Sequence, residues 1–299
     1  MRGTPVPAMK RHRASRSVPF SIIRTHSAEK PDYRIPPGTG KIQLRTAEKG
    51  RTTMKIVIIH GQSHEGSTCM AARALAVQVG GEVREFFLPR NFDKPCLGCY
   101  ACFQTDLSQC PHFRELEPLA EAILAADLLI LASPVYVYHA TGQMMSLLDH
   151  FGTWWVVHRP RPEMSGKQAV AIATAAGGGM NTTVRDMADS LEMWGIRRVY
   201  RLGVGVQAAR PDEIPGPILE KLRRKTDRLA RRIRKNAGRR GYNRRAKMWF
   251  HLMRFAHRHF PPAEPDYGYW EERGWHGRKR PWDREEDPAL SGAGKEKTT

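Results

Sequence analysis

The feature that most constrains the fold is a regular alternation of short apolar runs with amphipathic segments between Met54 and Gln207. Five runs rich in β-branched and small apolar residues fit strands: KIVIIH (55–60), EVREFFLP (82–89), LLILASPVY (128–136), KQAVAIATA (167–175) and RRVYRLGVGV (197–206). The segments between most of them have helical periodicity. Strands that alternate with helices in this way predict a doubly wound α/β fold with a five-stranded parallel sheet.

The distribution of charge divides the chain into parts. The net charge is +19; residues 1–53 contribute +9, residues 221–260 contribute +15, and residues 54–220 carry −3. Residues 1–53 show no apolar periodicity, which predicts disorder, and the abrupt change at Met54 favours a native start there over an organellar transit peptide. We therefore expect a disordered basic extension (1–53), an α/β domain (54–210), and a basic, helical and aromatic C-terminal extension (211–299).

The C-terminal extension carries apolar side chains in a basic setting. In the segment RRAKMWFHLMRFAHRHF (244–260), Met248, Leu252 and Phe255 share one helical stripe. The stripe predicts packing on the sheet domain or on a second subunit, with membrane-surface binding as the alternative. Further along, Tyr269, Trp270 and Trp275 are expected to dock, within the chain or between subunits.

Partners and compartment follow from composition. Because the central body is slightly acidic, the charge pattern disfavours nucleic acid as the partner. No apolar stretch reaches the ~20 residues of a membrane-spanning helix. The first residues lack a signal-peptide pattern, and four of the five cysteines lie in one short cluster rather than in a disulfide framework. These observations predict a cytoplasmic protein without a transmembrane segment.

Three loops follow predicted strands, where open α/β sheets bind their ligands. The first loop, GQSHEGST (61–68), has small and hydroxyl residues before a helix, which suits a phosphate, although a plain N-cap turn has the same composition. The second, SPVYVYHATG (133–142), offers the flat faces of Tyr136 and Tyr138, or ordinary packing at a strand end. The third, TAAGGGMNT (174–182), allows close approach to its backbone. Together the loops suit FMN.

These three loops, in this order, resemble those of the flavodoxin-like NADPH-dependent FMN reductase family over Met54 to Gln207. The resemblance implies a flavodoxin-like sheet, FMN as cofactor, NAD(P)H as a possible electron donor, and a homodimer or higher homo-oligomer. It also implies the cofactor-binding residues, which are Ser63, Ser67, Thr68, Pro134, Val135, Tyr136, Gly177 and Gly178. The chain departs from the family pattern at Met144-Met145 and Asp149-His150, where a lysine and Asp-Arg are usual.

The cysteine cluster CLGCYACFQTDLSQC (96–110) has the spacing C-x2-C-x2-C-x7-C and is followed by proline. Repeated x2 spacings are typical of iron-sulfur loops. A four-cysteine zinc site more often has two separated CxxC pairs, and a redox CxxC pair leaves two thiols unexplained. The motif resembles that of the iron-sulfur flavoproteins, which implies a 4Fe-4S cluster on Cys96, Cys99, Cys102 and Cys110. A structural loop without a cluster is the alternative, and Cys69 is expected to be a buried packing residue.

These observations predict an enzyme, an NAD(P)H-dependent FMN oxidoreductase or electron-transfer flavoprotein. It would serve a small-molecule or protein electron donor and acceptor. Because the flavin carries the chemistry, we assign no catalytic side chain. One alternative is a quinone or FMN reductase without a cluster. The other is a non-catalytic protein that binds nucleic acid or a membrane surface through its basic flanks.

Overall fold

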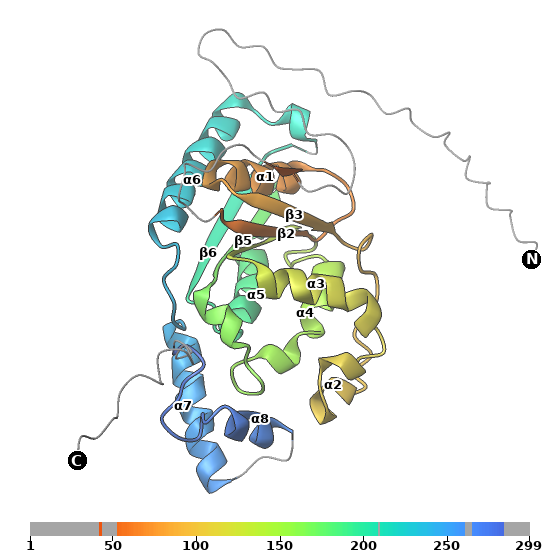
Figure 1. The fold of residues 1–299 in the computed structure, drawn as a ribbon. Coiled ribbons are helices and arrows are strands. Elements are labelled where there is room, and N and C mark those ends of the chain that lie inside the picture. Colours follow the sequence, from red (N-terminus) through yellow and green to blue (C-terminus); the bar gives the residue numbers. More distant parts are fainter. Residues whose placement is uncertain (1–41, 44–52, 209, 261–264, 284–299) are drawn as a thin grey trace, which may run out of the picture. The chain divides into compact units, whose positions relative to one another are not determined.

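The computed structural model describes residues 42–43, 53–208, 210–260 and 265–283. Its centre is a sheet with the strand order β1-β3-β2-β4-β5-β6 (Figure 1). The strands are β1 (Ile42–Gln43), β2 (Lys55–His60), β3 (Glu82–Phe87), β4 (Leu128–Pro134), β5 (Gln168–Ala175) and β6 (Arg198–Gly205). The five strands from β2 onward are parallel and lie within one or two residues of the predicted ranges. Their order is that of a flavodoxin-like sheet, so the predicted fold class is confirmed.

Strand β1 was not predicted. It pairs antiparallel with β3 through Ile42 opposite Val83 and Gln43 opposite Glu82, within the segment for which we expected disorder. A run of two residues is too short to give a periodic signal, which is why sequence analysis missed it. Most of the predicted extension, including residues 1–41, lies outside the described residues.

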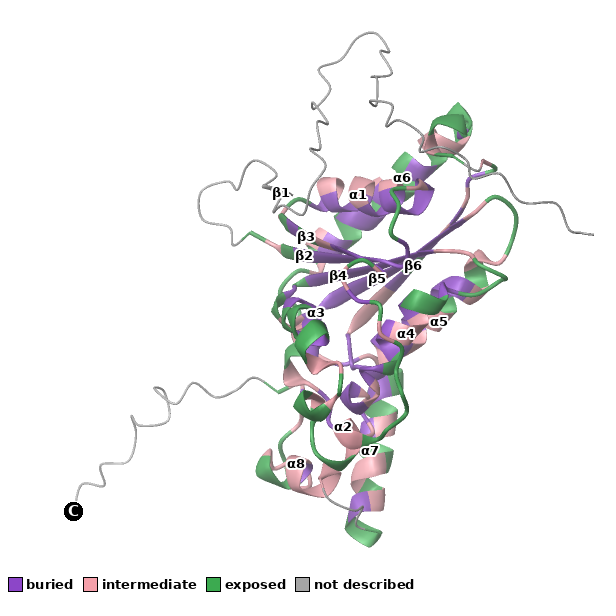
Figure 2. Ribbon diagram, turned by 90° about the vertical axis from the view of Figure 1, so that its right-hand side faces the viewer, coloured by how far each residue is buried: buried purple, intermediate pink, exposed green. Residues whose placement is uncertain are grey.

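Helices cover both faces of the sheet, as the edge-on view of Figure 2 shows. One face carries α1 (Ser67–Val79) and α6 (Gly216–Lys235), and the other carries α3 (Phe113–Ala125), α4 (Gly142–Asp149) and α5 (Met180–Met193). The side chains of each strand alternate between these layers: Ile56 and Ile58 of β2 pack toward α1, and Val57 and Ile59 pack toward α3. Strands buried on both faces become continuous apolar runs, which explains why they are readable from sequence.

Helix α6 lies inside the range that we assigned to the C-terminal extension, yet it packs on the sheet domain. Its residues Leu222, Leu229 and Ile233 are buried in the same apolar cluster as α1. Gln168 of β5 also donates to the carbonyl of Ile233 at 3.0 Å. The basic residues of α6 occupy its outer face, so much of the positive charge of 221–260 belongs to a sheet-covering helix.

Beyond α6, helices α7 (Arg244–His259) and α8 (Asp266–Glu272) form a smaller apolar cluster with Val156 and Met193 of the α/β body. Phe250 of α7 stacks on Trp270 of α8 with ring centroids 4.6 Å apart. Trp270 and Trp275 are buried. The Tyr269 hydroxyl donates to the carbonyl of Pro160 at 2.9 Å. The predicted docking aromatics therefore dock within the chain.

The predicted packing stripe of α7 does not pack on the sheet domain. Met248, Leu252 and Phe255 are 59 %, 51 % and 59 % exposed, and the buried positions of the helix are instead Ala246, Phe250 and His257. The face that contains Phe250 is buried because Phe250 stacks on Trp270 of α8. This partner lies too far along the sequence to be inferred from the periodicity of α7 alone. None of the described helices combines the length and apolarity needed to cross a membrane.

Candidate functional site

The strand order reverses direction at β2, whose neighbours β3 and β4 are reached by crossovers on opposite faces of the sheet. Ligands of doubly wound sheets bind outside the carboxyl ends of the strands at this point. The loop after β2 and the loop after β4 flank it directly, and the loop after β5 adjoins the latter. The three loops singled out by sequence analysis therefore meet at one edge of the sheet.

Buried hydroxyl groups join the first two loops. The Thr141 hydroxyl donates to the carbonyl of Gly61 at 2.6 Å, and the amide of Thr141 donates to the Ser133 hydroxyl at 2.9 Å. A Cβ built on Gly61 would lie 2.7 Å from the Thr141 hydroxyl oxygen, so the close approach requires glycine. Sequence analysis did not single out Thr141 or Ser133 as site residues, because their role depends on this long-range contact.

The first loop leads into an open helix N-terminus. Gly66 is the N-cap of α1 and offers no side-chain cap, and the first turn contains no acidic residue. The first backbone N–H groups of a helix have no intrahelical acceptor, and they favour an anion together with the helix dipole. Ser67 is 9 % exposed and Ser63 is exposed, whereas the buried hydroxyl of Thr68 pairs with that of Thr174 at 2.6 Å. Thr68 is therefore placed to present its backbone N–H rather than a free hydroxyl.

An ionic network that runs from the exposed Glu65 to the buried His60 connects this loop to α1 and β3. Arg73 of α1 pairs with Glu65 of the loop at 2.8 Å and with Glu85 of β3 at 2.9 Å, and Glu85 also contacts His60 at 2.9 Å. Burial opposes the charge of Glu85, but the hydrogen bonds from His60 and Arg73 outweigh it and hold the pKa of this carboxyl below its usual value. Nearby, burial raises the pKa of Cys69 to about 12, and the residue is 1 % exposed, which confirms it as a packing residue.

One cation near the first loop was not predicted. The guanidinium of Arg90, which follows β3, donates to the carbonyl of Ser63. The ring of Phe87 lies 5.3 Å from its guanidinium carbon and supports it. A positive charge at this place would attract an anion bound at the start of α1. No local sequence signal marks this cation, because Arg90 is 27 residues away from Ser63 in the chain.

The second loop is a tight hairpin that presents its side chains outward. Tyr136 and His139 exchange two backbone hydrogen bonds of 3.0 Å, and the two residues between them, Val137 and Tyr138, have φ values of 49° and 67°. Positive φ is rare for a β-branched residue and costs of order 1–3 kcal/mol. Asp186 of α5 holds the hairpin by accepting from the amide of Ala140 at 3.2 Å. Tyr136 and Tyr138 are 50 % and 66 % exposed, so their faces are accessible.

The third loop lies against the second. Gly179, with φ of +90°, approaches Val135 so closely that a Cβ at Gly179 would lie 2.7 Å from a Val135 methyl carbon. A Cβ at Gly178 would meet the Tyr138 ring at 3.7–4.0 Å, whereas Gly177 has open space around it. Pro134 and Val135, at the exit of β4, are half-buried beneath this contact. The structure thus brings all eight predicted cofactor-binding residues to the same rim.

The four clustered cysteines also come together. Cys96, Cys99, Cys102 and Cys110 line one cavity of about 180 Å³, which Pro111, His112, Asp149 and His150 line as well. Partial burial, and then the charges of the neighbouring cysteines, raise the pKa of Cys102, and burial raises that of Cys110. Four thiols around one cavity fit a thiolate-bound metal or cluster. Binding would have to remove their protons.

Arg159 holds the cysteine loop in place. This buried side chain donates to the carbonyls of Cys102, Phe103 and Thr105, and its Nε lies 2.9 Å from a carboxylate oxygen of Asp266 in α8. The C-terminal extension is thereby connected to the cysteine loop through one guanidinium group. No sequence pattern marks Arg159, since its partners are 54 or more residues away.

Fold and site together define a flavodoxin-like α/β protein in which an uncapped helix N-terminus, two exposed tyrosines and a glycine-rich loop lie at one edge of the sheet. The sequence profile of the NADPH-dependent FMN reductase family matches residues 54–206. The chain belongs to this family of FMN-dependent oxidoreductases. The predicted family, enzyme class and flavin are therefore confirmed.

Two relatives are named as iron-sulfur flavoproteins, a description that concerns the clustered cysteines. An iron-sulfur flavoprotein of Archaeoglobus fulgidus is 26 % identical over 66 % of this chain and 86 % of its own length. An iron-sulfur flavoprotein of Methanocaldococcus jannaschii is 28 % identical over 45 % of this chain and 69 % of its own. Among solved structures, the apo form of an NADH:FMN oxidoreductase matches at 18 % identity with a TM-score of 0.45. That match covers 64 % of this chain and 95 % of the other.

Proposed function

We propose that this protein is an FMN-dependent reductase that takes electrons from NAD(P)H and that seats FMN on the three loops at the switch point of the sheet. The observation that carries the proposal is the junction of these loops through Thr141, Gly61 and Gly179. Bound FMN supplies hydride and single-electron chemistry that no side chain of the protein has. The electron acceptor is then a small molecule or a protein.

Different residues at the rim contact different parts of FMN. The N–H groups at the start of α1, with the Ser67 hydroxyl and the charge of Arg90, bind the phosphate. Pro134, Val135 and Tyr136 border the ring system, and the backbone at Gly177 and Gly178 lies along it. His139 and Asp186, whose nearest side-chain atoms are 3.3 Å apart, keep the aromatic hairpin in position.

We further propose that Cys96, Cys99, Cys102 and Cys110 hold a 4Fe-4S cluster. Their common cavity and the names of the relatives support this ligand set. A cluster of this kind supplies one-electron transfer. Arg159 contributes by fixing the carbonyls of the loop that carries Cys102.

The assembly and the compartment are also proposals. The exposed stripe of Met248, Leu252 and Phe255 supports a contact between two copies of the chain in a homo-oligomer. We place the protein in the cytoplasm, where four clustered thiols stay reduced. The division into a flavin-binding domain of 54–210 and an extension of 211–299 likewise stays a prediction.

Anaerobic purification of the full chain tests these proposals together. We expect one FMN per chain, loss of the oxidised-flavin absorbance on addition of NADH or NADPH, and about four iron and four sulfide ions per chain. If NAD(P)H reduces the bound flavin but the protein contains no iron, the protein is a reductase without a cluster. A protein without flavin whose basic flanks retain salt-sensitive RNA or lipid binding would overturn the enzyme proposal.

A further inference from the structure

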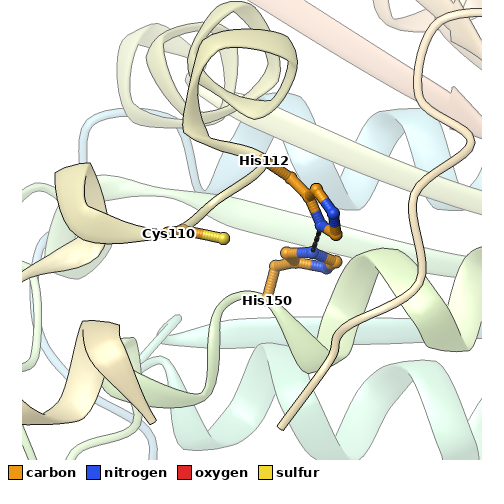
Figure 3. Close-up of side chains that lie close together, drawn as sticks. All are labelled: Cys110, His112 and His150. Atoms are coloured by element: carbon orange, nitrogen blue, oxygen red, sulfur yellow. Dashed lines mark hydrogen bonds between the residues drawn. The ribbon is translucent and has the colours of Figure 1, made fainter. Parts of the chain in front are cut away.

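Two histidines stand beside the last cysteine of the cluster, as Figure 3 shows. Cys110 ends a short 3-10 turn (Leu107–Gln109), His112 precedes α3, and His150 follows α4. The thiol sulfur of Cys110 and one nitrogen from each ring lie within 4.8 Å of one another. Three potential metal ligands from separate elements therefore converge on one point at the cavity of the cysteines.

His150 is held in the orientation of a metal ligand. It is 2 % exposed, and its Nδ1 lies 2.8 Å from the carbonyl of Ser146, to which it donates. This bond places the lone pair of the neutral ring on Nε2, which faces His112. Histidine ligands of metals commonly donate their other ring nitrogen to a carbonyl or carboxylate in this way, which fixes the tautomer.

The spacing of the two rings matches a tetrahedral metal site. His112 Nδ1 and His150 Nε2 are 3.4 Å apart and form a long hydrogen bond, which is the dashed line in Figure 3. Two nitrogens that bind one tetrahedral zinc ion at ~2.0–2.1 Å would be separated by ~3.3–3.4 Å. A zinc ion could therefore replace the hydrogen bond and bind both nitrogens at close to their present separation. The Cys110 sulfur would have to lie ~3.6 Å from each nitrogen, and the three atoms are already within 4.8 Å of one another.

We propose that Cys110, His112 and His150 form a mononuclear site for zinc, in which a thiolate and two imidazoles bind the ion. The fourth position faces the cavity, where water or one of the other cysteines completes the tetrahedron. This ligand set differs from the four-cysteine zinc site that the sequence spacing disfavours. Because Cys110 would also be a cluster ligand, zinc and the 4Fe-4S cluster are alternative occupants. The inference does not depend on flavin binding.

Binding is an exchange of a proton for a metal ion without any change of oxidation state. Zn²⁺ replaces the proton of the Cys110 thiol, which leaves to solvent, and both imidazoles bind as neutral rings. Loading the site with zinc should consequently prevent later assembly of a cluster on the same chain. Conversely, the protein with an intact cluster should not take up zinc at this place.

Cobalt titration of the full chain provides the test. The background is a Cys96→Ser/Cys99→Ser variant, which lacks two cluster ligands but keeps the proposed site. In anaerobic, metal-free buffer we expect one Co²⁺ per chain, with thiolate-to-metal charge transfer and the strong d–d bands of tetrahedral geometry. Zn²⁺ should displace the Co²⁺ and abolish these bands.

Three further substitutions in this background locate the ligands. Cys110→Ser should reduce the charge-transfer band and weaken Co²⁺ binding, and His112→Ala and His150→Gln should each weaken Co²⁺ binding at least about 100-fold. His259→Ala, an exposed histidine of α7, is the matched control and should bind as the background does. If the buried His150 variant does not fold, His112→Ala alone decides the test. Unchanged affinity in His112→Ala, or absence of stoichiometric Co²⁺ binding in the background, would overturn the proposal.

Discussion

A substitution at the first turn of α1 would test the proposed phosphate seat. Ser67→Asp places a carboxylate at the open helix N-terminus, whereas Ser67→Ala removes only the hydroxyl and keeps every backbone N–H. An acidic residue in the first turn stabilises a helix by about 0.3–1 kcal/mol. We therefore expect Ser67→Asp to fold at least as well as the unmodified protein while it loses FMN.

The size of the loss follows from Coulomb's law. Two unit charges about 4 Å apart repel by ~1 kcal/mol in water and by ~4 kcal/mol at an effective dielectric constant of ~20. Ser67 is 9 % exposed, so the repulsion between a carboxylate at this position and the phosphate should lie between the value for water and the value for a dielectric constant of ~20. At ~2 kcal/mol per unit charge, a phosphate that carries about 1.5–2 charges is weakened by roughly 3–4 kcal/mol, or about 10²–10³-fold in Kd.

Quenching of flavin fluorescence during titration of flavin-depleted protein measures the Kd of both variants, and thermal unfolding reports their stability. Ser67→Ala should weaken binding by about tenfold or less, since a single hydrogen bond is lost. If Ser67→Asp binds FMN as tightly as Ser67→Ala does, the phosphate does not lie at the start of α1.

Three further results are expected. Arg90→Gln should weaken FMN about tenfold but leave the Kd of riboflavin unchanged; equal effects on both ligands would contradict a phosphate contact. Arg159→Met breaks the buried pair with Asp266 and should cost about 3 kcal/mol of unfolding free energy. It should also speed alkylation of Cys102, as followed by peptide mass spectrometry. An unchanged alkylation rate would show that Arg159 does not restrain the cysteine loop. Burial lowers the pKa of Lys167 from 10.5 to about 8, so the unfolded chain binds more protons in this interval. The free energy of unfolding of the unmodified protein, minus that of Lys167→Met, should therefore rise by about 3 kcal/mol between pH 8 and 10.5 in urea titrations. The difference cancels the opposite contribution of the buried Cys69 thiol, and a difference that does not change with pH would contradict the prediction.

The fold was largely predictable because its signals are local. Parallel strands buried on both faces are continuous apolar runs, so β4 and β5 were located from sequence within one or two residues. The strand-end position of the loops at Gly61 and Gly179 then followed from the general geometry of doubly wound sheets. The buried face of α7 was not predictable, since it is selected by Trp270 in another helix.

The candidate site was predicted less completely than the fold. The four cysteines are recognisable in the sequence by their spacing, and the three loops are recognisable by their composition. In contrast, Thr141, Arg90 and Arg159 make their long-range contacts with partners 27 to 107 residues away along the chain. His150 reaches His112 across 38 residues, and its buried position beside Cys110 could only be found in the folded protein.

The measurement that tests the central claim most directly is a comparison of FMN with riboflavin, which lacks the phosphate. Flavin-depleted full-length protein is titrated with each ligand under the same conditions. If the three loops seat FMN with its phosphate at the N-terminus of α1, FMN should bind at least about 100-fold more tightly, a difference of about 2.7 kcal/mol. Equal affinities, or no binding of either flavin, would contradict the account.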